Sequence, residues 1–227
     1  DETDLAPLLQ WTRDKDPAVR AAALSALGIL VSSSGDKCHP RKRMSPVPEA
    51  ALSTLVEALV DDEVAIRLAA IDSLGWIGPD AAAAGPALKD VLRDPNTSGP
   101  AFLALYNVMG PDEIWASGTQ DLLPAVLRVI QRGDSWARSR AAASLGHLGK
   151  LCRQPSPIPG SDDGSLKLAL GALEGALADH DRQVSSQAAE ALGEFGADAR
   201  GSLDSLIGAL KRGEIREIPS ASTLDRI

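Results

Sequence analysis

Aromatic residues are scarce in this sequence: four Trp, two Phe and one Tyr make up 3% of its 227 residues. Its hydrophobic share is nevertheless 44%, supplied largely by Ala and Leu. Basic residues are also in the minority, with 23 Lys and Arg against 31 Asp and Glu, a net charge of −8. Because general nucleic-acid binders carry a basic surface, this balance argues against a nucleic-acid partner.

Long hydrophobic runs and targeting signals are absent too. No apolar run approaches the roughly 20 residues that span a bilayer, so we expect no membrane insertion. No signal peptide is present, and residue 1 is Asp rather than Met. We therefore expect the chain to be a segment of a longer protein, with truncated termini.

Catalytic and metal-binding motifs are missing as well. The chain has no GxSxG, no glycine-rich phosphate loop and no HExxH motif. Its three histidines lack ligand spacing, and Cys38-His39 has no second pair to complete the four ligands that zinc takes. The sequence thus predicts no catalytic residue, no metal site and no cofactor.

What the sequence does contain is a repeat. The stretch at residues 61–78, DDEVAIRLAAIDSLGWIG, recurs five times in altered form, at residues 16–30, 63–78, 98–110, 134–149 and 181–196. Aligned on a Leu-Gly or Met-Gly pair, the copies share a glycine in register: Gly28, Gly75, Gly110, Gly146 and Gly193. A fixed period of this kind indicates a stack of helical hairpins.

Each conserved place in the pattern has a physical reason. Asp16, Ser98, Asp134 and Asp181 are good N-cap residues and should begin the second helix of each hairpin. A glycine inside a helix costs about 1 kcal/mol relative to alanine, so its recurrence predicts a close backbone contact. Three later glycines, Gly78, Gly149 and Gly196, suit the left-handed residue that ends a helix.

The resulting fold class is all-α: a right-handed α-solenoid of five helical pairs plus a terminal half repeat. One repeat domain covers residues 1–212, and residues 213–227 form a C-terminal tail. The repeats lie at about residues 3–31, 48–78, 83–110, 120–149 and 165–196, with the half repeat at 199–212 and long loops at 32–47 and 150–164. Cys38 and Cys152 fall near these two loops, roughly 30 Å apart at the 8–10 Å spacing of packed helices. A disulfide needs Cα atoms within about 7 Å, so both should be free thiols, which favours a cytoplasmic location.

The pattern L..L...L-D-x-x-V-R-x-x-A-A-x-x-L-G-x-[LI]-G resembles HEAT repeats, in particular the HEAT-like subtype named from phycobilisome lyases. Residues 52–78 and 122–149 carry it most clearly. The resemblance implies an armadillo-like solenoid in which an Arg after the Val pairs with acidic turn residues along the stack. Arg20, Arg67 and Arg138 match that Arg, whereas Phe102 and Ser185 replace it, so such a ladder should be broken at repeats 3 and 5.

The resemblance also implies that the second helices line the concave face and bind partners there. Helical spacing picks out the strip of each second helix that should face away from the core. We call these residues the predicted strip: Leu68, Asp72, Trp76, Leu103, Asn107, Trp136, Ser139, His147, Gln183, Glu190 and Glu194.

Several features allow more than one interpretation. Trp76 and Trp136 could anchor a partner, or they could cover gaps beside the degenerate third repeat. The basic cluster at residues 37–43 could bind an acidic group, although a solvated loop is more common. The incomplete sixth pair should expose an apolar helix face, covered either by self-association or by residues 215–227.

The sequence therefore predicts a non-catalytic protein–protein interaction scaffold that binds a protein or peptide partner on the concave face. The alternative is a bilin lyase or lyase subunit of the HEAT-like type, although no residue of this sequence identifies a bilin site.

Overall fold

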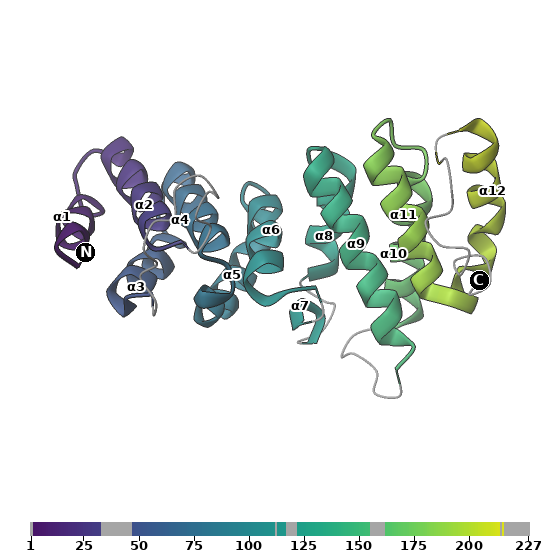
Figure 1. Ribbon diagram of the computed structural model, residues 1–227, viewed down its shortest axis with the longest axis horizontal. Coiled ribbons are helices and arrows are strands. Elements are labelled where there is room, and N and C mark those ends of the chain that lie inside the picture. Colours follow the sequence, from purple (N-terminus) through teal and green to yellow (C-terminus); the bar gives the residue numbers. More distant parts are fainter. Residues whose placement is uncertain are drawn as a thin grey trace. The chain divides into compact units, whose positions relative to one another are not determined.

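The computed structural model describes residues 2–32, 47–111, 113–116, 122–154, 162–213 and 215. Among these residues all regular structure is helical, in agreement with the predicted fold class (Figure 1). The chain divides into two compact units, Asp1–Gly110 and Pro111–Ile227, which we call unit 1 and unit 2. The prediction of one repeat domain over residues 1–212 stays a prediction.

Unit 1 consists of three helical pairs. The first two pairs are regular, and the third begins with two short 3₁₀ segments around a six-residue helix. In chain order the elements are α1 (Glu2–Trp11) and α2 (Pro17–Val31), α3 (Glu49–Ala58) and α4 (Val64–Ile77), then η1 (Gly78–Ala84), α5 (Gly85–Asp90), η2 (Val91–Arg93) and α6 (Ser98–Met109). Pro79 and Pro86 sit at the starts of η1 and α5, where a missing N–H is tolerated. Repeated helix starts of this kind explain why the first half of pair 3 is broken.

Unit 2 contains a short helix, two regular pairs and a final half pair. Its elements are α7 (Glu113–Ala116), α8 (Leu122–Arg132) with α9 (Ser135–Cys152), α10 (Asp163–Ala176) with α11 (Arg182–Phe195), then η3 (Gly196–Ser202) and α12 (Leu203–Arg212). Helix α12 is the first helix of the predicted sixth pair. It exposes Ile207, whereas Ile215 beyond it is buried. Because residues 216–227 lie outside the described residues, both predictions for this end of the chain remain open.

Three of the four predicted N-cap residues are confirmed. Asp16 and Asp181 each accept a hydrogen bond from the backbone N–H two residues on, and Asp134 from the one three residues on. The expectation for Ser98 is wrong, because Thr97 is the N-cap of α6 and Ser98 is its first residue. Helix α6 therefore begins one residue earlier than it would with Ser98 as its cap, and Ser98 is buried.

The second helices of consecutive pairs pack directly on one another within each unit: α2 on α4, α4 on α6, and α9 on α11. These are the close contacts that the glycines predicted. A Cβ added to Gly28 would overlap the side chain of Ser73, and one added to Gly146 would lie 2.9 Å from the Cα of Ala191. Gly75 faces Ala104 in the same way, at 3.3 Å from its Cα.

The predicted roles of Gly110 and Gly149 are wrong, and each glycine has the kind of role that was predicted for the other. Gly110 does not pack inside a helix; it ends α6 with φ +81°, as Gly78 and Gly196 end α4 and α11. Gly149 does not end α9, which continues to Cys152. A Cβ on Gly149 would lie 2.5 Å from the ring of Phe195, so this glycine admits an aromatic side chain from the next pair.

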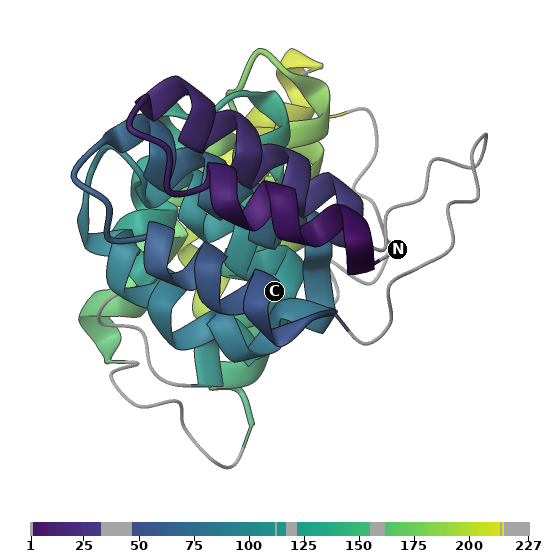
Figure 2. The same cartoon turned by 90° about the vertical axis from the view of Figure 1, so that its left-hand side faces the viewer.

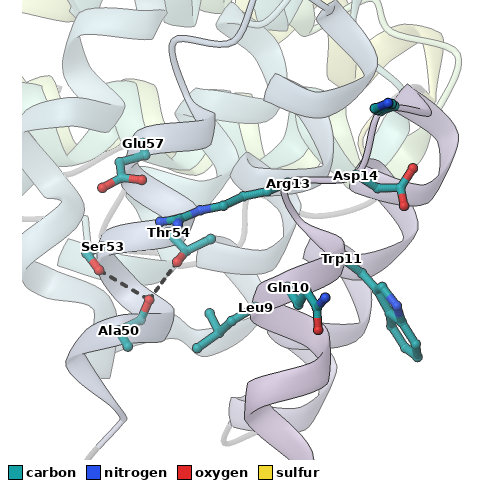
Figure 3. Close-up of a pocket in the computed structure, with 10 residues that line it drawn as sticks. Leu9, Gln10, Trp11, Arg13, Asp14, Ala50, Ser53, Thr54 and Glu57 are labelled. Atoms are coloured by element: carbon teal, nitrogen blue, oxygen red, sulfur yellow. Dashed lines mark hydrogen bonds between the residues drawn. The ribbon is translucent and has the colours of Figure 1, made fainter.

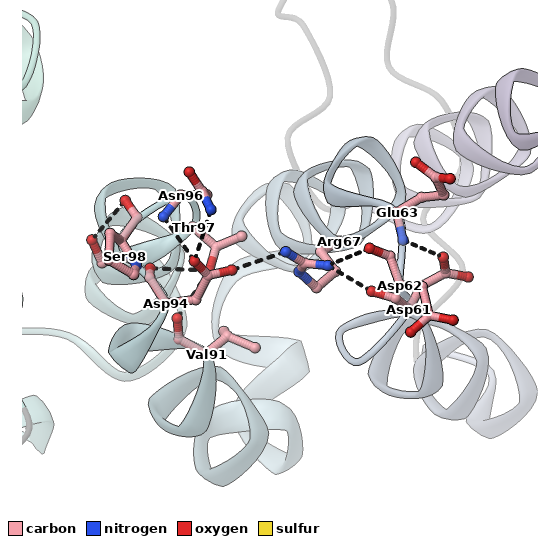
Figure 4. A network of polar contacts seen from close by, with 10 residues as sticks. Asp61, Asp62, Glu63, Arg67, Val91, Asp94, Asn96, Thr97 and Ser98 are labelled. Atoms are coloured by element: carbon pink, nitrogen blue, oxygen red, sulfur yellow. Dashed lines mark hydrogen bonds and ion pairs between the residues drawn. The ribbon is translucent and has the colours of Figure 1, made fainter.

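The arginine ladder implied by the resemblance is present. Arg67 donates hydrogen bonds to the carbonyls of Asp61 and Asp62 in its own turn, at 2.7 and 2.9 Å (Figure 4). The same guanidinium reaches the carboxylate of Asp94 in the next turn at 2.9 Å. Arg138 and Asp179 form the equivalent pair in unit 2, and Arg20 approaches Asp61 at 3.8 Å. Each arginine thus connects its own turn to the next one.

The ladder stops where the sequence predicted. Phe102 is fully buried and packs edge-to-face on Tyr106, with ring centroids 6.2 Å apart. Ser185 is also buried. Phe102 and Ser185 carry no guanidinium group that could pair with an acidic residue of the following turn.

Candidate functional site

The predicted strip lies on two separate surfaces, one in each unit. In unit 1 it consists of residues on α4 and α6, and we call it the unit 1 surface: Leu68, Asp72, Trp76, Leu103 and Asn107. Asp72, Trp76 and Asn107 are exposed, and the two leucines are half-buried. The amide of Asn107 lies 3.5 Å from the carbonyl of Gly75, which joins the two helices at the surface.

Asp72 is the titratable group of the unit 1 surface. It stands one helical turn from Trp76, so both side chains share one face of α4. Neighbouring protein atoms remove part of its hydration, and this burial raises the pKa of the carboxyl above its ordinary value. A carboxylate that has lost hydration gains more from a cation than a fully hydrated one.

In unit 2 the strip borders a real depression. A groove of about 370 Å³ runs between α9 and α11, and we call it the α9/α11 groove: Ala143, Gly146, His147, Lys150, Gln187, Glu190, Ala191 and Glu194. Its floor is shallow because Gly146 meets Ala191 without a side chain between the helices. Three predicted strip residues, His147, Glu190 and Glu194, are thereby brought together.

The two walls of the groove carry different charges. Helix α9 contributes Lys150 and His147, while α11 contributes Glu190 and Glu194. Gln187 donates to Glu190 at 3.1 Å, and Arg153 donates to the backbone carbonyl of Glu194 at 3.3 Å. The groove therefore offers hydrogen-bonding groups of both signs over an open, solvent-accessible floor.

The remaining strip residues of unit 2 do not line this groove. Trp136 is 47% exposed near the start of α9, with the guanidinium of Arg140 5.2 Å from its ring centroid. Gln183 is exposed at the start of α11. Ser139 is only 5% exposed, so the expectation that it faces outward is wrong. The neighbouring Arg140 and Ala143 are half-buried on this stretch of α9.

Two groove residues escaped the sequence analysis. Lys150 follows His147 by three positions, and it was missed because α9 was expected to end at Gly149. Gln187 precedes Glu190 by three positions. In both cases the i, i+3 spacing from a strip residue was the available signal.

The tryptophans differ in burial. Trp115, in the short helix α7, is fully buried, and its Nε1–H donates to the carbonyl of Ser144 at 2.9 Å. Trp76 is 43% exposed. Trp115 is therefore a core residue of unit 2, and both interpretations of Trp76 and Trp136 remain predictions.

A further depression lies between α1 and α3. It has a volume of about 910 Å³ and is lined by polar and apolar side chains of the two helices and the turn after α1 (Figure 3). Arg13, Thr54 and Glu57 are among them, with no buried acid–base pair or nucleophile. These residue types do not suggest a catalytic role for the depression between α1 and α3.

In the described part of the chain, no three His, Cys, Asp or Glu side chains gather as metal ligands. Cys152 is half-buried at the end of α9 and forms no disulfide with another described residue. Cys38, the basic cluster at residues 37–43 and the proline-rich segment at 155–160 lie outside the described residues. No described helix is long and apolar enough to cross a bilayer.

Comparison with known proteins agrees with this architecture. Residues 5–106 match the family model for HEAT repeats. A search of curated proteins gives no match. The HEAT-like subtype and the bilin lyase alternative remain predictions from the sequence.

Solved structures extend the likeness to nearly the whole chain. A computationally designed armadillo repeat protein for modular peptide recognition has a TM-score of 0.64 at 18% identity, over 98% of this chain and 99% of its own. A designed armadillo repeat protein in complex with the peptide (KR)4 gives 0.60 at 18%, over 98% and 95%. An engineered protein, structural genomics target OR366, gives 0.62 at 22%, over 98% and 95%. At these identities the likeness shows the fold alone: the chain has a helical-repeat fold of the armadillo/HEAT type, and residues 5–106 match the HEAT-repeat model.

Proposed function

We propose that this chain is a non-catalytic scaffold that binds a protein or peptide partner on the exposed faces of its second helices. The observation that carries the proposal is the α9/α11 groove, where side chains of two packed second helices form an open, polar channel. Trp76 and Trp136 lie on second helices as well, with about half of each side chain exposed. Exposed tryptophans are frequent anchors in protein interfaces because their desolvation contributes much of the binding energy.

Charge indicates the kind of partner. The chain carries a net charge of −8, and Asp72, Glu190 and Glu194 stand on the two surfaces. A partner presenting Arg or Lys side chains would pair with these carboxylates and stack its guanidinium groups on tryptophan. The designed armadillo protein bound to (KR)4 supports a basic peptide as the first probe.

A binding role fits the surface better than catalysis. Glu190 and Lys150 are exposed, and His147 is half-buried at the edge of an open groove. Acid–base catalysis generally depends on groups that are desolvated and held in a closed site. Water-accessible side chains of this kind are better suited to reversible ion pairs.

The test is titration of the intact chain with (KR)4 and with the acidic peptide (ED)4, followed by isothermal calorimetry. We expect (KR)4 to bind and to weaken as salt rises, because exposed ion pairs are screened. The double variant Glu190→Gln/Glu194→Gln should weaken that binding at least fivefold, and Trp76→Ala should do so independently. Trp11→Ala is the matched control, since Trp11 is similarly exposed but lies on α1. Equal binding of both peptides, or loss of binding only in Trp11→Ala, would contradict the proposal.

A further inference from the structure

The two walls of the α9/α11 groove carry different polar groups, and these groups are staggered along its length. Helix α11 contributes the carboxylates of Glu190 and Glu194, which stand one helical turn apart, about 6 Å at 1.5 Å per residue. Helix α9 contributes His147 and Lys150. An imidazole has an N–H donor whether it is neutral or protonated, and an ammonium has three. One wall therefore accepts hydrogen bonds and the other can donate them.

The packing of α9 on α11 fixes the position of the imidazole along the groove. A Cβ on Gly146 would lie 2.9 Å from the Cα of Ala191, so these two residues stand at the same level. His147 is then level with the residue after Ala191, which lies midway between the two glutamates. At 1.5 Å per residue, His147 stands about 3 Å beyond Glu190 and about 3 Å before Glu194.

Lys150 continues the same order. Gly149 lies against the ring of Phe195, further along both helices than the first contact, so α9 and α11 run in the same direction. Lys150, the next residue of α9, therefore stands beyond Glu194 by the rise of one or two residues, about 1.5–3 Å. Along the groove the polar groups thus alternate between the walls in the order carboxylate, imidazole, carboxylate, ammonium.

An extended peptide has nearly the same period. Its residues advance by about 3.3 Å each, and successive side chains point to opposite sides. A peptide lying along the groove would bring alternate side chains to α11 and to α9, in step with the alternation of the walls. Side chains that reach α11 meet carboxylates and pair best as Lys or Arg, whereas those that reach α9 meet N–H donors and pair best as Asp or Glu.

Unit 1, which Figure 2 shows with α1 and α2 in front, does not repeat this pattern. Its second helices pack in the same register, with Gly28 of α2 against Ser73 of α4. Asp72 and Trp76 stand where α11 has its two glutamates, and Ile29 stands where α9 has its imidazole. The alternation of polar groups is therefore particular to the α9/α11 groove and is not a consequence of the repeat.

We propose that the α9/α11 groove binds an extended peptide segment whose charges alternate in sign along the chain. Its basic side chains pair with Glu190 and Glu194, and its acidic side chains accept hydrogen bonds from His147 and Lys150. This inference rests on the proposed function, because it takes the groove as a peptide-binding surface. It adds the conformation of the partner and the order of its charges.

The test compares two peptides of identical composition, (KE)4 and KKKKEEEE, by isothermal calorimetry with the intact chain. Both have the same number of charges of each sign, and both are too short to hold a helix in water, so they differ in the order of their charges. We expect (KE)4 to bind at least fivefold more tightly. In the block peptide, half of the side chains would face a wall that carries their own sign of charge.

Three variants assign the two walls. Lys150→Gln should weaken the binding of (KE)4 at least threefold and should not weaken that of (KR)4, because it removes a cation from the wall that faces acidic side chains. The double variant Glu190→Gln/Glu194→Gln should weaken the binding of both peptides. Lys167→Gln is the matched control, because Lys167 is an exposed lysine of α10 that does not line the groove.

The outcomes separate this inference from the proposed function. If (KR)4 binds through Glu190 and Glu194 while (KE)4 binds no more tightly than KKKKEEEE, the proposed function stands and the alternation of charges is wrong. A preference for (KE)4 that is unchanged in Lys150→Gln would also overturn the inference, since α9 would then not select the acidic side chains. If none of the three peptides binds, the proposed function fails and the inference fails with it.

Discussion

The guanidinium of Arg138 holds the carboxylate of Asp179 through two hydrogen bonds, Nε to Oδ2 at 2.7 Å and Nη2 to Oδ1 at 2.9 Å. Both side chains are almost buried, at 12% and 11% exposure. The third nitrogen, Nη1, donates to the carbonyl of Gly133 at 2.7 Å. One side chain therefore fastens the turn of pair 4 and joins it to the turn of pair 5.

Removing Arg138 should lower the free energy of unfolding by more than removing Arg20, its counterpart in pair 1. Arg138→Ala leaves a nearly buried carboxylate without its cation, and we expect a loss of about 2–3 kcal/mol in the free energy of unfolding. Arg20→Ala should cost under about 1 kcal/mol, because Arg20 is more exposed and lies 3.8 Å from Asp61. Urea denaturation followed by circular dichroism measures both. Equal losses would show that the geometry of the pair does not determine its contribution.

Acid should weaken the same contact. Burial acts to raise the pKa of Asp179, but hydrogen bonds from Arg138 and the Asp181 N–H outweigh it and hold the pKa below its ordinary value. A lowered pKa in the folded state means that the stabilisation is present above the unfolded-state pKa of about 3.9 and is lost as pH falls through the folded-state pKa. Asp179→Asn should therefore flatten the dependence of stability on pH below about 4. Asp163→Asn is the control, and an unchanged acid slope in Asp179→Asn would contradict the assignment.

The contribution of Asp72 to stability should depend on pH in the opposite direction to that of Asp179. Its pKa is raised by burial, so its ionised form costs stability at neutral pH, and stability recovers as pH falls through the raised pKa. Asp72→Asn should slightly raise the melting temperature at pH 7 while weakening the binding of (KR)4. A variant that is both more stable and a poorer binder would indicate that the Asp72 carboxylate contributes to binding at the unit 1 surface and not to folding stability. A lower melting temperature in Asp72→Asn would rule this out.

Glycine-to-alanine changes should have opposite signs at two helical positions of unit 2. Gly146→Ala places a methyl group 2.9 Å from the Cα of Ala191, and overpacking of this kind costs about 1–3 kcal/mol. Gly171→Ala, in α10, meets nothing within 4 Å, so it should stabilise by about 0.5–1 kcal/mol through better helix propensity. Thermal melts of the two variants give the comparison. Stabilisation by both would mean that α9 and α11 do not approach as closely as described.

The tryptophans should divide into structural and surface groups. Trp115→Ala removes a fully buried side chain and its bond to Ser144, and such changes cost about 3–5 kcal/mol. Trp76→Ala and Trp136→Ala should each cost under about 1.5 kcal/mol, because roughly half of each side chain already faces water. Melting temperature and peptide binding are measured together. If Trp76→Ala lowers the melting temperature and leaves binding unchanged, Trp76 is a packing residue.

The sequence predicted the parts of the structure that depend on residues close together in the chain. Asp16, Asp134 and Asp181 cap their helices because a carboxylate needs only the next turn of backbone. The arginine pairs at Asp94 and Asp179 were expected from the resemblance to HEAT repeats, whose arginine position Arg67 and Arg138 match. Helical spacing also predicted three of the eight residues that line the groove, His147, Glu190 and Glu194.

Predictions failed where a contact from another helix decides the outcome. Gly149 and Gly110 both follow a long apolar side chain near the end of a repeat, yet Phe195 packs on the first while the second ends α6 with a positive φ of 81°. Ser139 has the spacing of an exposed residue but lies buried. Trp115 stands in a segment without periodicity, and only its hydrogen bond to Ser144 shows that it belongs to the core.

By itself, the sequence determined that this is an all-helical repeat protein with glycine contacts between second helices. These features follow from periodicity, because the same residue types recur at the same positions of each repeat, whereas the arginine link between turns was implied by the resemblance to HEAT repeats. Only the tertiary structure decided which side chains share the α9/α11 groove and that Ser139 is buried. These facts depend on the rotation of each helix about its axis and on which neighbour is in place, and neither is encoded within a single repeat.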